Sequence, residues 1–218
     1  MNLVHTAFVP AGDGPFPTLV AIHGWGASAQ DLLGLAPILA GGRFLVLCPQ
    51  GPVQVPIGPG HHGYGWFPLV PGTAPNPVEF AQGAVALRTF LDEALETYPV
   101  DRRRTFLLGF SQGGGMGYDL ALRYPERFRG LAALSTWMPP ALAESLPKGE
   151  ATRGFPVLVV HGTEDPLVEI QRGRDSRDRL EEFGVDLTYH EFPMGHEIRP
   201  EALRELDRWL VEKLEASG

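Results

Sequence analysis

The segment TFLLGFSQGG, residues 105–114, carries the strongest fold signal, because an apolar run passes through a glycine-rich turn into a helical pattern. The run Thr105–Leu108 is too short for a helix and stops at a glycine, which is typical of a strand buried on both faces. The residues that follow, Gln112–Tyr124, have helical spacing and stop at Pro125. A strand that turns directly into a helix is the repeating unit of α/β proteins.

Six further segments have the composition of strands and extend this unit in both directions. Four are short apolar runs, most of them bounded by Gly or Pro: Leu19–Ile22, Phe44–Leu47, Leu131–Leu134 and Val157–Val160. Leu187–Phe192 alternates more between apolar and polar residues, which favours an edge of the sheet. Leu3–Val9 is predicted as an antiparallel lead-in strand.

Helical patterns separate most of these strands. They cover Ser28–Ala40, Val78–Tyr98, Leu167–Phe183 and Pro200–Leu214. Strands that alternate with helices need crossover connections, so we predict a doubly wound, mostly parallel sheet with helices on both faces. Residues 1–218 are expected to form a single α/β domain, and the 21 residues Thr136–Pro156 are too few for a large lid.

The segment Pro49–Pro77 is predicted as a long loop. It has 29 residues, and eight of them are prolines. Loops of this length inside a compact domain are usually functional. This loop also contains Trp66 and Phe67, whose large rings are costly to expose to water.

Composition excludes several classes of protein. Hydrophobic residues make up 44% of the chain, which is typical of a globular protein, and the net charge of −8 argues against nucleic-acid binding. Cys48 is the only cysteine, so neither an internal disulfide nor a cysteine-rich zinc site can form. We see no signal peptide and no apolar run long enough to cross a membrane. We therefore expect a cytoplasmic location and no membrane insertion.

The pattern Gly109-x-Ser111-x-Gly113 matches the nucleophile elbow, a strained turn that lifts a serine hydroxyl clear of the sheet. The pattern alone is weak, but a strand leads into it and a helix leads out of it, as the motif requires. A serine hydroxyl is a poor nucleophile until a base removes its proton, and that base needs an orienting partner. We therefore expect an acid and a histidine near Ser111.

The acid and the base should follow later strands, because the site of an open parallel sheet forms at the carboxyl ends of its strands. In this fold the chain order is serine, acid, histidine. Asp165 follows a predicted strand 54 residues after Ser111, and His196 comes 31 residues later, after the last strand. Two other acids compete for this role. Glu164 points away from the site if Asp165 points inward, and Asp186 begins its strand and so lies at the opposite edge of the sheet from the site.

The other six histidines have simpler interpretations. His23 and His161 lie in His-Gly turns and are expected to be structural or to support the site. His5 and His190 lie in predicted strands. His61 and His62 are adjacent and have no nearby acids. The adjacent pair is not expected to bind a metal.

Two backbone N–H groups are expected to form an oxyanion hole. One belongs to Gln112, the residue after the nucleophile. The other comes from the glycine-containing segment HGWG, residues 23–26, where Trp25 is the best candidate. The indole of Trp25 could instead cover a wall of the pocket.

Four more apolar residues follow strand ends or lie in the long loop: Trp66, Phe67, Trp137 and Met138. They are candidates for the substrate-binding walls. Ordinary packing of the loops is an equally good interpretation.

Several of these motifs together resemble the phospholipase/carboxylesterase family of α/β-hydrolases, which includes the acyl-protein thioesterases. The likeness extends over nearly the whole chain and rests on IHGWG (22–26), GFSQGG (109–114), HGTEDPLV (161–168) and MGH (194–196), with GWF (65–67) and LS (134–135) as further landmarks. The resemblance implies a catalytic triad of Ser111, Asp165 and His196. It also implies an oxyanion hole made by Trp25 and Gln112.

Two positions depart from the acyl-protein thioesterases. Those proteins usually have aspartate after His-Gly-x-Gly and after Trp-Phe, where this chain has Ala27 and Pro68. The segment Val53–Gly63 also has little of their pattern. The chain therefore looks more like a bacterial carboxylesterase than a thioesterase for acylated proteins.

The expected function is a serine hydrolase that cleaves small-molecule carboxylic esters of small to medium acyl chain through an acyl-enzyme. This chemistry needs no metal and no cofactor. Hydrolysis of thioesters or lysophospholipids by the same triad stays open, as does the oligomeric state. A non-catalytic binding protein on the same fold is a remote alternative, because no triad residue and no glycine of the elbow is missing.

Overall fold

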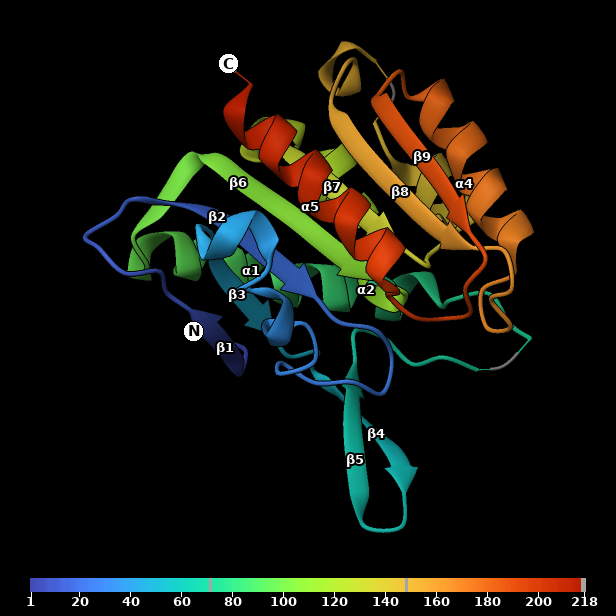
Figure 1. The fold of residues 1–218 in the computed structure, drawn as a ribbon. Helices are drawn as coiled ribbons and strands as arrows, with labels where there is room; N and C mark the ends of the chain where they lie inside the picture. Colours follow the sequence, from blue (N-terminus) through green and yellow to red (C-terminus); the bar gives the residue numbers. More distant parts are fainter. Residues whose placement is uncertain (71, 148, 217–218) are drawn as a thin grey trace.

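The computed structural model describes residues 1–70, 72–147 and 149–216. Its centre is a seven-stranded sheet (Figure 1). In spatial order the strands are β1 (His5–Phe8), β3 (Leu45–Pro49), β2 (Phe16–Ile22), β6 (Val100–Phe110), β7 (Gly130–Leu134), β8 (Pro156–Gly162) and β9 (Asp186–Phe192). Only β1 is antiparallel to its neighbour. The predicted mostly parallel sheet is confirmed, with β1 and β9 at its edges.

The pairing of β6 sets the position of the site. On one side Ile22 of β2 pairs with Gly109, and on the other side Phe110 pairs with Leu134 of β7. The segments that leave the carboxyl ends of these three strands therefore start side by side. Candidate site residues that are far apart in the sequence meet at this edge of the sheet.

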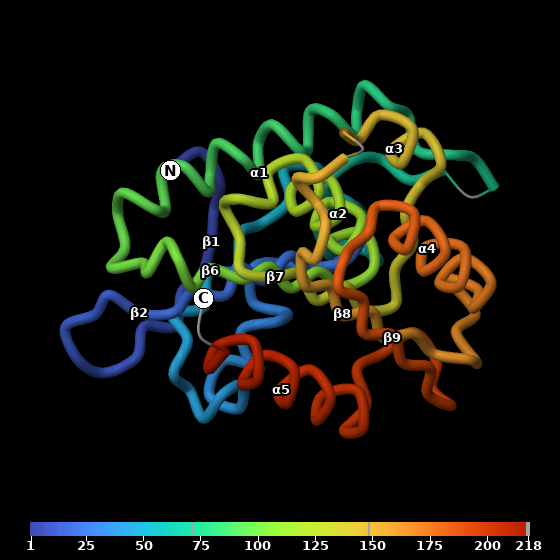
Figure 2. The backbone as a smooth tube through the Cα atoms, turned by 90° about the horizontal axis from the view of Figure 1, so that it is seen from above, coloured from blue at the N-terminus to red at the C-terminus, as the bar shows by residue number. Residues whose placement is uncertain are grey.

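Helices cover both faces of the sheet (Figure 2). On one face lie α1 (Pro77–Thr97), α2 (Gln112–Arg123), α3 (Pro140–Ser145) and α4 (Ile170–Glu182), and on the other lies α5 (Pro200–Glu215). Each face of the sheet has its own buried apolar layer, because the strands are apolar on both sides. None of the described helices is long and apolar enough to cross a membrane.

The predicted helix Ser28–Ala40 is wrong. The segment contains only two short 3₁₀ turns, Leu33–Leu35 and Leu39–Gly42. Pro37 lies in the middle of it, where a proline lacks the N–H that an α-helix needs. Ala40 also has a positive φ of 49°, which ends any right-handed helix. These turns and helix α5 together cover the face of the sheet opposite α1.

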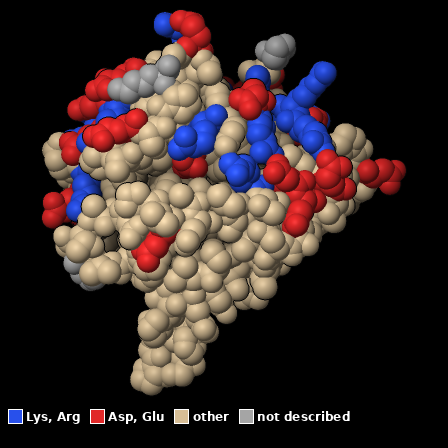
Figure 3. Space-filling view, turned by 180° about the vertical axis from the view of Figure 1, so that it is seen from behind, with Lys and Arg blue, Asp and Glu red and all other residues tan. Residues whose placement is uncertain are grey.

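The segment Pro49–Pro77 is not simply a loop, because a hairpin lies within it. Strands β4 (Val53–Gly58) and β5 (His61–Gly65) pair antiparallel and project beyond the main sheet (Figure 1). Pro56 is accommodated next to an irregularity in the pairing, the kind of position at which strands tolerate proline. Residues 44–78 contain no charged residue, and on the face that Figure 3 shows the hairpin is free of Lys, Arg, Asp and Glu.

Candidate active site

The turn at Ser111 has the backbone conformation of a nucleophile elbow. Ser111 has φ 53° and ψ −120°, a conformation that costs energy for any residue with a side chain. Its N–H donates to the carbonyl of Leu134 at 2.9 Å, and its own carbonyl accepts the hydroxyl of Thr136 at 2.6 Å and the N–H of Gly114 at 2.9 Å. These three hydrogen bonds hold the strained residue between β6 and α2.

Close backbone contacts explain the two glycines of the motif. A Cβ atom at Gly113 would overlap the carbonyl oxygen of Ile22, and one at Gly109 would lie 2.5 Å from the carbonyl oxygen of Gly113. Both obstacles are backbone atoms, so neither can move aside without moving a strand or the helix. The elbow packs this tightly because α2 starts directly against β2 and β6.

Asp165 and His196 form a hydrogen-bonded pair. Asp165 follows β8 and is 5% exposed, and its Oδ2 accepts Nδ1–H of His196 at 2.7 Å. Its other oxygen, Oδ1, accepts the N–H groups of Leu167 and Val168, both at 2.9 Å. A carboxylate can only accept, so the proton of a neutral His196 lies on Nδ1 and leaves Nε2 able to take up a proton.

Ser111 and His196 lie near each other at the carboxyl edge of the sheet. The ring of Phe110, the residue before Ser111, packs on the ring of His196 with centroids 5.0 Å apart. No hydrogen bond joins the Ser111 hydroxyl to His196 in the structure, so this link of the triad stays a prediction. In enzymes without bound substrate such hydrogen bonds are often long or poorly aligned.

His161 supports the acid from behind, a role that the sequence left open. It is fully buried, its Nε2–H donates to the carbonyl of Val168 at 2.7 Å, and the same nitrogen lies 3.9 Å from Oδ2 of Asp165. Gly173 of α4 packs so closely on this ring that a Cβ there would lie 2.6 Å from Nδ1. The histidine and α4 together fix the turn that carries Asp165.

The two candidate oxyanion donors lie on adjoining segments. A Cβ at Gly24 would lie only 3.2 Å from the Cβ of Ser111, so the segment after β2 passes directly beside the nucleophile. Within the described residues, the backbone N–H groups of Trp25 and Gln112 donate no hydrogen bond. Their role as oxyanion donors to a substrate stays a prediction.

The side chain of Gln112 has a role that sequence reasoning missed. Its Oε1 accepts the N–H of Trp66 at 2.8 Å, and its Nε2 donates to the carbonyl of Phe67 at 2.7 Å. The indole N–H of Trp66 in turn donates to the carbonyl of His23 at 2.9 Å. These bonds tie the end of the hairpin segment to the elbow and to the HGWG segment. The sequence shows only that an amide residue follows Ser111, and it does not show what that amide binds.

The hairpin also bonds directly to the segment that carries Trp25. The N–H of Gly26 donates to the carbonyl of Tyr64 at 2.8 Å, and the N–H of Tyr64 donates to the carbonyl of Ala27 at 2.7 Å. At the base of the hairpin, a Cβ at Gly63 would overlap the carbonyl of Gly26, and one at Gly65 would overlap the ring of Trp25. The position of Trp25 therefore depends on the hairpin.

The four other candidate wall residues differ in exposure. Trp66, Phe67 and Met138 are each at most 2% exposed and belong to the apolar layer under α1 and α2. Trp137 is partly exposed, and the guanidinium of Arg172 lies 5.6 Å from the centre of its ring. Packing accounts for the three buried residues, and contact of any of the four with substrate stays a prediction. Among the residues that the structure describes, no group of three or more His, Cys, Asp or Glu could hold a metal ion.

His23 is a buried neutral histidine whose two nitrogens are both used. Its Nε2 accepts the N–H of Gly51 at 3.0 Å, so the proton lies on Nδ1, which donates to the carbonyl of Gly24 at 2.7 Å. Burial lowers the pKa of His23 from its ordinary value of 6.5, since the charged form loses its hydration. A protonated ring could not accept from Gly51.

We expect this histidine to make the fold less stable in acid. Below pH 6.5 the unfolded chain takes up a proton at His23 that the folded chain resists, so the contribution is complete above that pH and is lost as the pH falls. Urea unfolding at pH 7.5 and pH 5.5 measures the change in the free energy of unfolding. The His23→Gln variant, which keeps a donor and an acceptor, should show a smaller loss than the wild type.

The control is His62→Gln, which removes an exposed histidine of the hairpin. This variant should keep the pH dependence of the wild type. Equal losses in the wild type and in His23→Gln would contradict the assignment to His23.

Known proteins match this chain over most or nearly all of its length. The family model described as Phospholipase/Carboxylesterase matches residues 5–213. Acyl-protein thioesterase 1 of Mycosarcoma maydis is 28% identical over 244 residues, covering 99% of this chain and 100% of the relative. Acyl-protein thioesterase 1 of Gibberella zeae is 28% identical over 203 residues, covering 88% and 85%.

Solved structures also match this chain over nearly its whole length. The crystal structure of esterase PE8 superposes with a TM-score of 0.84 at 26% identity, covering 98% of this chain and 100% of that one. The carboxylesterase of Bacillus cereus has a TM-score of 0.82 at 23% identity, covering 97% and 94%, and is similar in fold.

Proposed function

Since the chain belongs to the phospholipase/carboxylesterase family, a family of carboxylic ester hydrolases, we propose that it cleaves esters of small to medium acyl chain through an acyl-enzyme on Ser111. The observation that carries this proposal is the 2.7 Å hydrogen bond between Asp165 and His196, at the same edge of the sheet as the strained Ser111. A hydrogen-bonded acid and histidine beside a strained serine are the groups that nucleophilic catalysis needs.

The first half of the reaction acylates the serine. Nε2 of His196 takes the hydroxyl proton while Oγ of Ser111 bonds to the ester carbonyl carbon, and Asp165 stabilises the imidazolium that forms. The carbonyl oxygen becomes an oxyanion that accepts the N–H groups of Trp25 and Gln112. When the carbon–oxygen bond to the alcohol breaks, His196 gives its proton to the leaving oxygen.

The second half uses water in place of the serine. His196 takes a proton from the water as its oxygen attacks the acyl-enzyme, and the second tetrahedral intermediate expels Ser111, which recovers its proton from the imidazolium. The products are a carboxylate and an alcohol. The uncharged surface of the hairpin, bonded to the segment that carries Trp25, suits the approach of an uncharged ester.

A thioesterase is the second candidate, because two relatives that match nearly the whole chain or most of it are named acyl-protein thioesterase 1. The same three residues would attack a thioester carbonyl. Ala27 and Pro68, which stand where those proteins usually have aspartate, favour the oxygen ester for this chain. A series of matched substrates separates the two.

The test combines active-site labelling with substrate profiling. A fluorophosphonate should add once to the wild type, and peptide mass spectrometry should find the adduct on Ser111. Ser111→Ala should give no adduct. Hydrolysis of p-nitrophenyl esters from acetate to palmitate at pH 7.5 then gives the acyl-chain optimum, with acyl-thiol esters of the same chains as the comparison. Labelling elsewhere, or no turnover of either series, would overturn the proposal, and the latter would favour a binding protein.

A further inference from the structure

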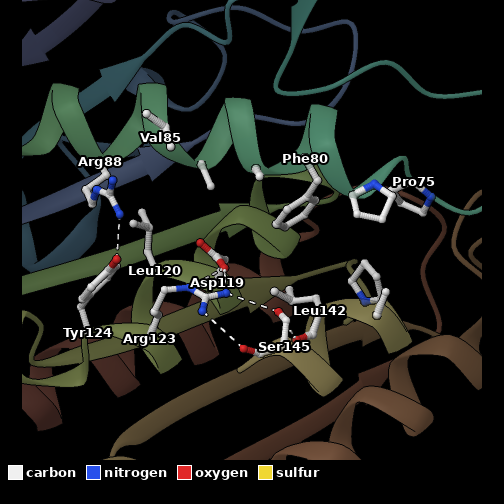
Figure 4. A pocket seen from close by; sticks show the side chains of 15 residues that line it. Pro75, Phe80, Val85, Arg88, Asp119, Leu120, Arg123, Tyr124, Leu142 and Ser145 are labelled. Atoms are coloured by element: carbon white, nitrogen blue, oxygen red, sulfur yellow. Dashed lines mark hydrogen bonds and ion pairs between the residues drawn. The ribbon is translucent and has the colours of Figure 1, made fainter. Parts of the chain in front are cut away.

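A groove of about 360 Å³ lies between α1, α2 and α3 (Figure 4). Its volume is within the range of small-molecule sites. Helix α2 contributes its second half to the groove, beginning at Asp119, whereas the elbow lies at the other end of that helix. None of the candidate residues of the active site lines the groove. It is therefore separate from the site described above.

The two ends of the groove differ in chemistry. One end is apolar, with Phe80 of α1 and Leu142 of α3 facing each other and Pro75 beyond them (Figure 4). At the other end lie the guanidinium of Arg88 and the phenol of Tyr124 (Figure 4). Phe80 and Arg88 are eight residues apart on one helix, which separates them by about 12 Å along its axis.

The charged groups along the groove leave one cation without a carboxylate. Asp119 pairs with Arg123 at 2.7 Å, so these two side chains balance each other. Arg88 donates to the hydroxyl of Tyr124 at 2.7 Å, and its guanidinium lies 5.8 Å from the centre of that ring. Within the described residues no acid lies within 4 Å of Arg88. The phenol of Tyr124 is a neutral partner, and the other four N–H donors of Arg88 have no hydrogen-bond partner among the described residues.

We propose that this groove binds a free aliphatic monocarboxylate of medium chain length. The planar guanidinium of Arg88 matches a carboxylate, which can accept two parallel N–H bonds from it. The chain then lies along α1 over Leu120 and ends between Phe80 and Leu142. A dianion would leave one charge unpaired in the groove, and a cation would be repelled by Arg88. A neutral alcohol of equal length would bury the same apolar chain but would form no charge-assisted hydrogen bonds with Arg88.

The test uses octanoate, octanol and acetate as three probes of the wild-type protein. Methyl resonances of Ala84, Val85, Leu120 and Leu142 report binding in the groove itself. Octanoate should shift them with a saturable dependence on concentration. Octanol should bind roughly ten- to hundredfold more weakly, because it lacks the charge-assisted hydrogen bonds. Acetate should leave these resonances in place, because it lacks the chain.

Three variants complete the experiment. Arg88→Gln keeps a donor for the Tyr124 hydroxyl, and it should reduce the affinity for octanoate to that for octanol. Ala84→Phe fills the groove and should abolish binding of both. Arg204→Gln removes an exposed arginine of α5, on the opposite face of the sheet, and should change neither affinity.

Three results would overturn the proposal. One is octanoate shifts confined to residues outside the groove. The second is equal affinity for octanoate and octanol, and the third is an unchanged octanoate affinity in Arg88→Gln. The methyl resonances distinguish these results from binding at the triad.

Discussion

The Asp165→Asn variant is expected to lose about 10⁴-fold in kcat for ester hydrolysis while it stays folded, because the change places the proton of His196 on the wrong nitrogen. The structure predicts how Asn would sit at this position. Its Oδ1 would keep the two N–H bonds from Leu167 and Val168, both 2.9 Å long in the wild type. Its amide NH₂ would then face Nδ1 of His196, where the wild type has a carboxylate oxygen.

An NH₂ group can only donate, so Nδ1 of His196 must accept and the ring proton must move to Nε2. The nitrogen that should take the proton of Ser111 would then already carry one. KM should change little, because neither side chain is expected to contribute much to ground-state binding of the ester. The rate and KM are measured with the p-nitrophenyl ester that the wild type cleaves best.

Glu164→Gln is the matched control, since it makes the same chemical change at the adjacent residue, which is exposed. It should keep wild-type kcat within about twofold, as expected for a surface substitution away from the site. A loss in Glu164→Gln as large as that in Asp165→Asn, or a fully active Asp165→Asn, would contradict the assignment of the acid.

The Gln112→Leu variant is expected to lower the free energy of unfolding by about 2–5 kcal/mol and to reduce kcat as well. Leucine is similar in size to glutamine but cannot form hydrogen bonds, so the main loss is that of the two hydrogen bonds. It leaves the N–H of Trp66 and the carbonyl of Phe67 buried without their partners at 2.8 and 2.7 Å. The backbone N–H of residue 112 remains, but the segments around it lose their link to the hairpin.

Urea unfolding gives the stability, and kcat at full saturation gives the catalytic effect. Gln82→Leu is the control, because it makes the same change on the exposed surface of α1, where we expect at most about 0.5 kcal/mol. Similar stability losses in the two variants would show that the buried amide contributes nothing special. A stable Gln112→Leu variant with wild-type kcat would remove the proposed link between the hairpin and the oxyanion donors.

The sheet could be predicted from the sequence because its signals are local. Each buried strand, such as Thr105–Leu108 or Val157–Val160, is a short apolar run that stops at a breaking residue or before a polar one. The helix predicted over Ser28–Ala40 rests on the capping residue Ser28 and the glycines that follow Ala40, and Pro37 inside the segment prevents it from forming. The hairpin β4–β5 has no such local signal, because its strands contain proline and glycine and its position is fixed by a long-range bridge between Tyr64 and Ala27.

The candidate site divides in the same way. The elbow at Ser111 could be predicted because the motif and its flanking strand and helix are contiguous. Asp165 and His196 followed from chain order and strand ends, and the structure brings these two together. The side-chain role of Gln112 and the hydroxyl of Thr136 that bonds to the Ser111 carbonyl could not be predicted. Both depend on which segments of the folded chain meet, and a single sequence does not contain that information.

The hairpin β4–β5 should tolerate substitutions at some of its glycines and not at others. At its tip, a Cβ at Gly58 would meet no atom within 4 Å, whereas at its base Gly63 and Gly65 are pressed against Gly26 and Trp25. A larger residue at position 58 should therefore cost little, whereas Gly60 beside it has a φ of +74° that only glycine adopts freely, and positions 63 and 65 have room only for glycine. Position 58 is the natural attachment point for a dye or a surface linker that leaves the predicted triad undisturbed.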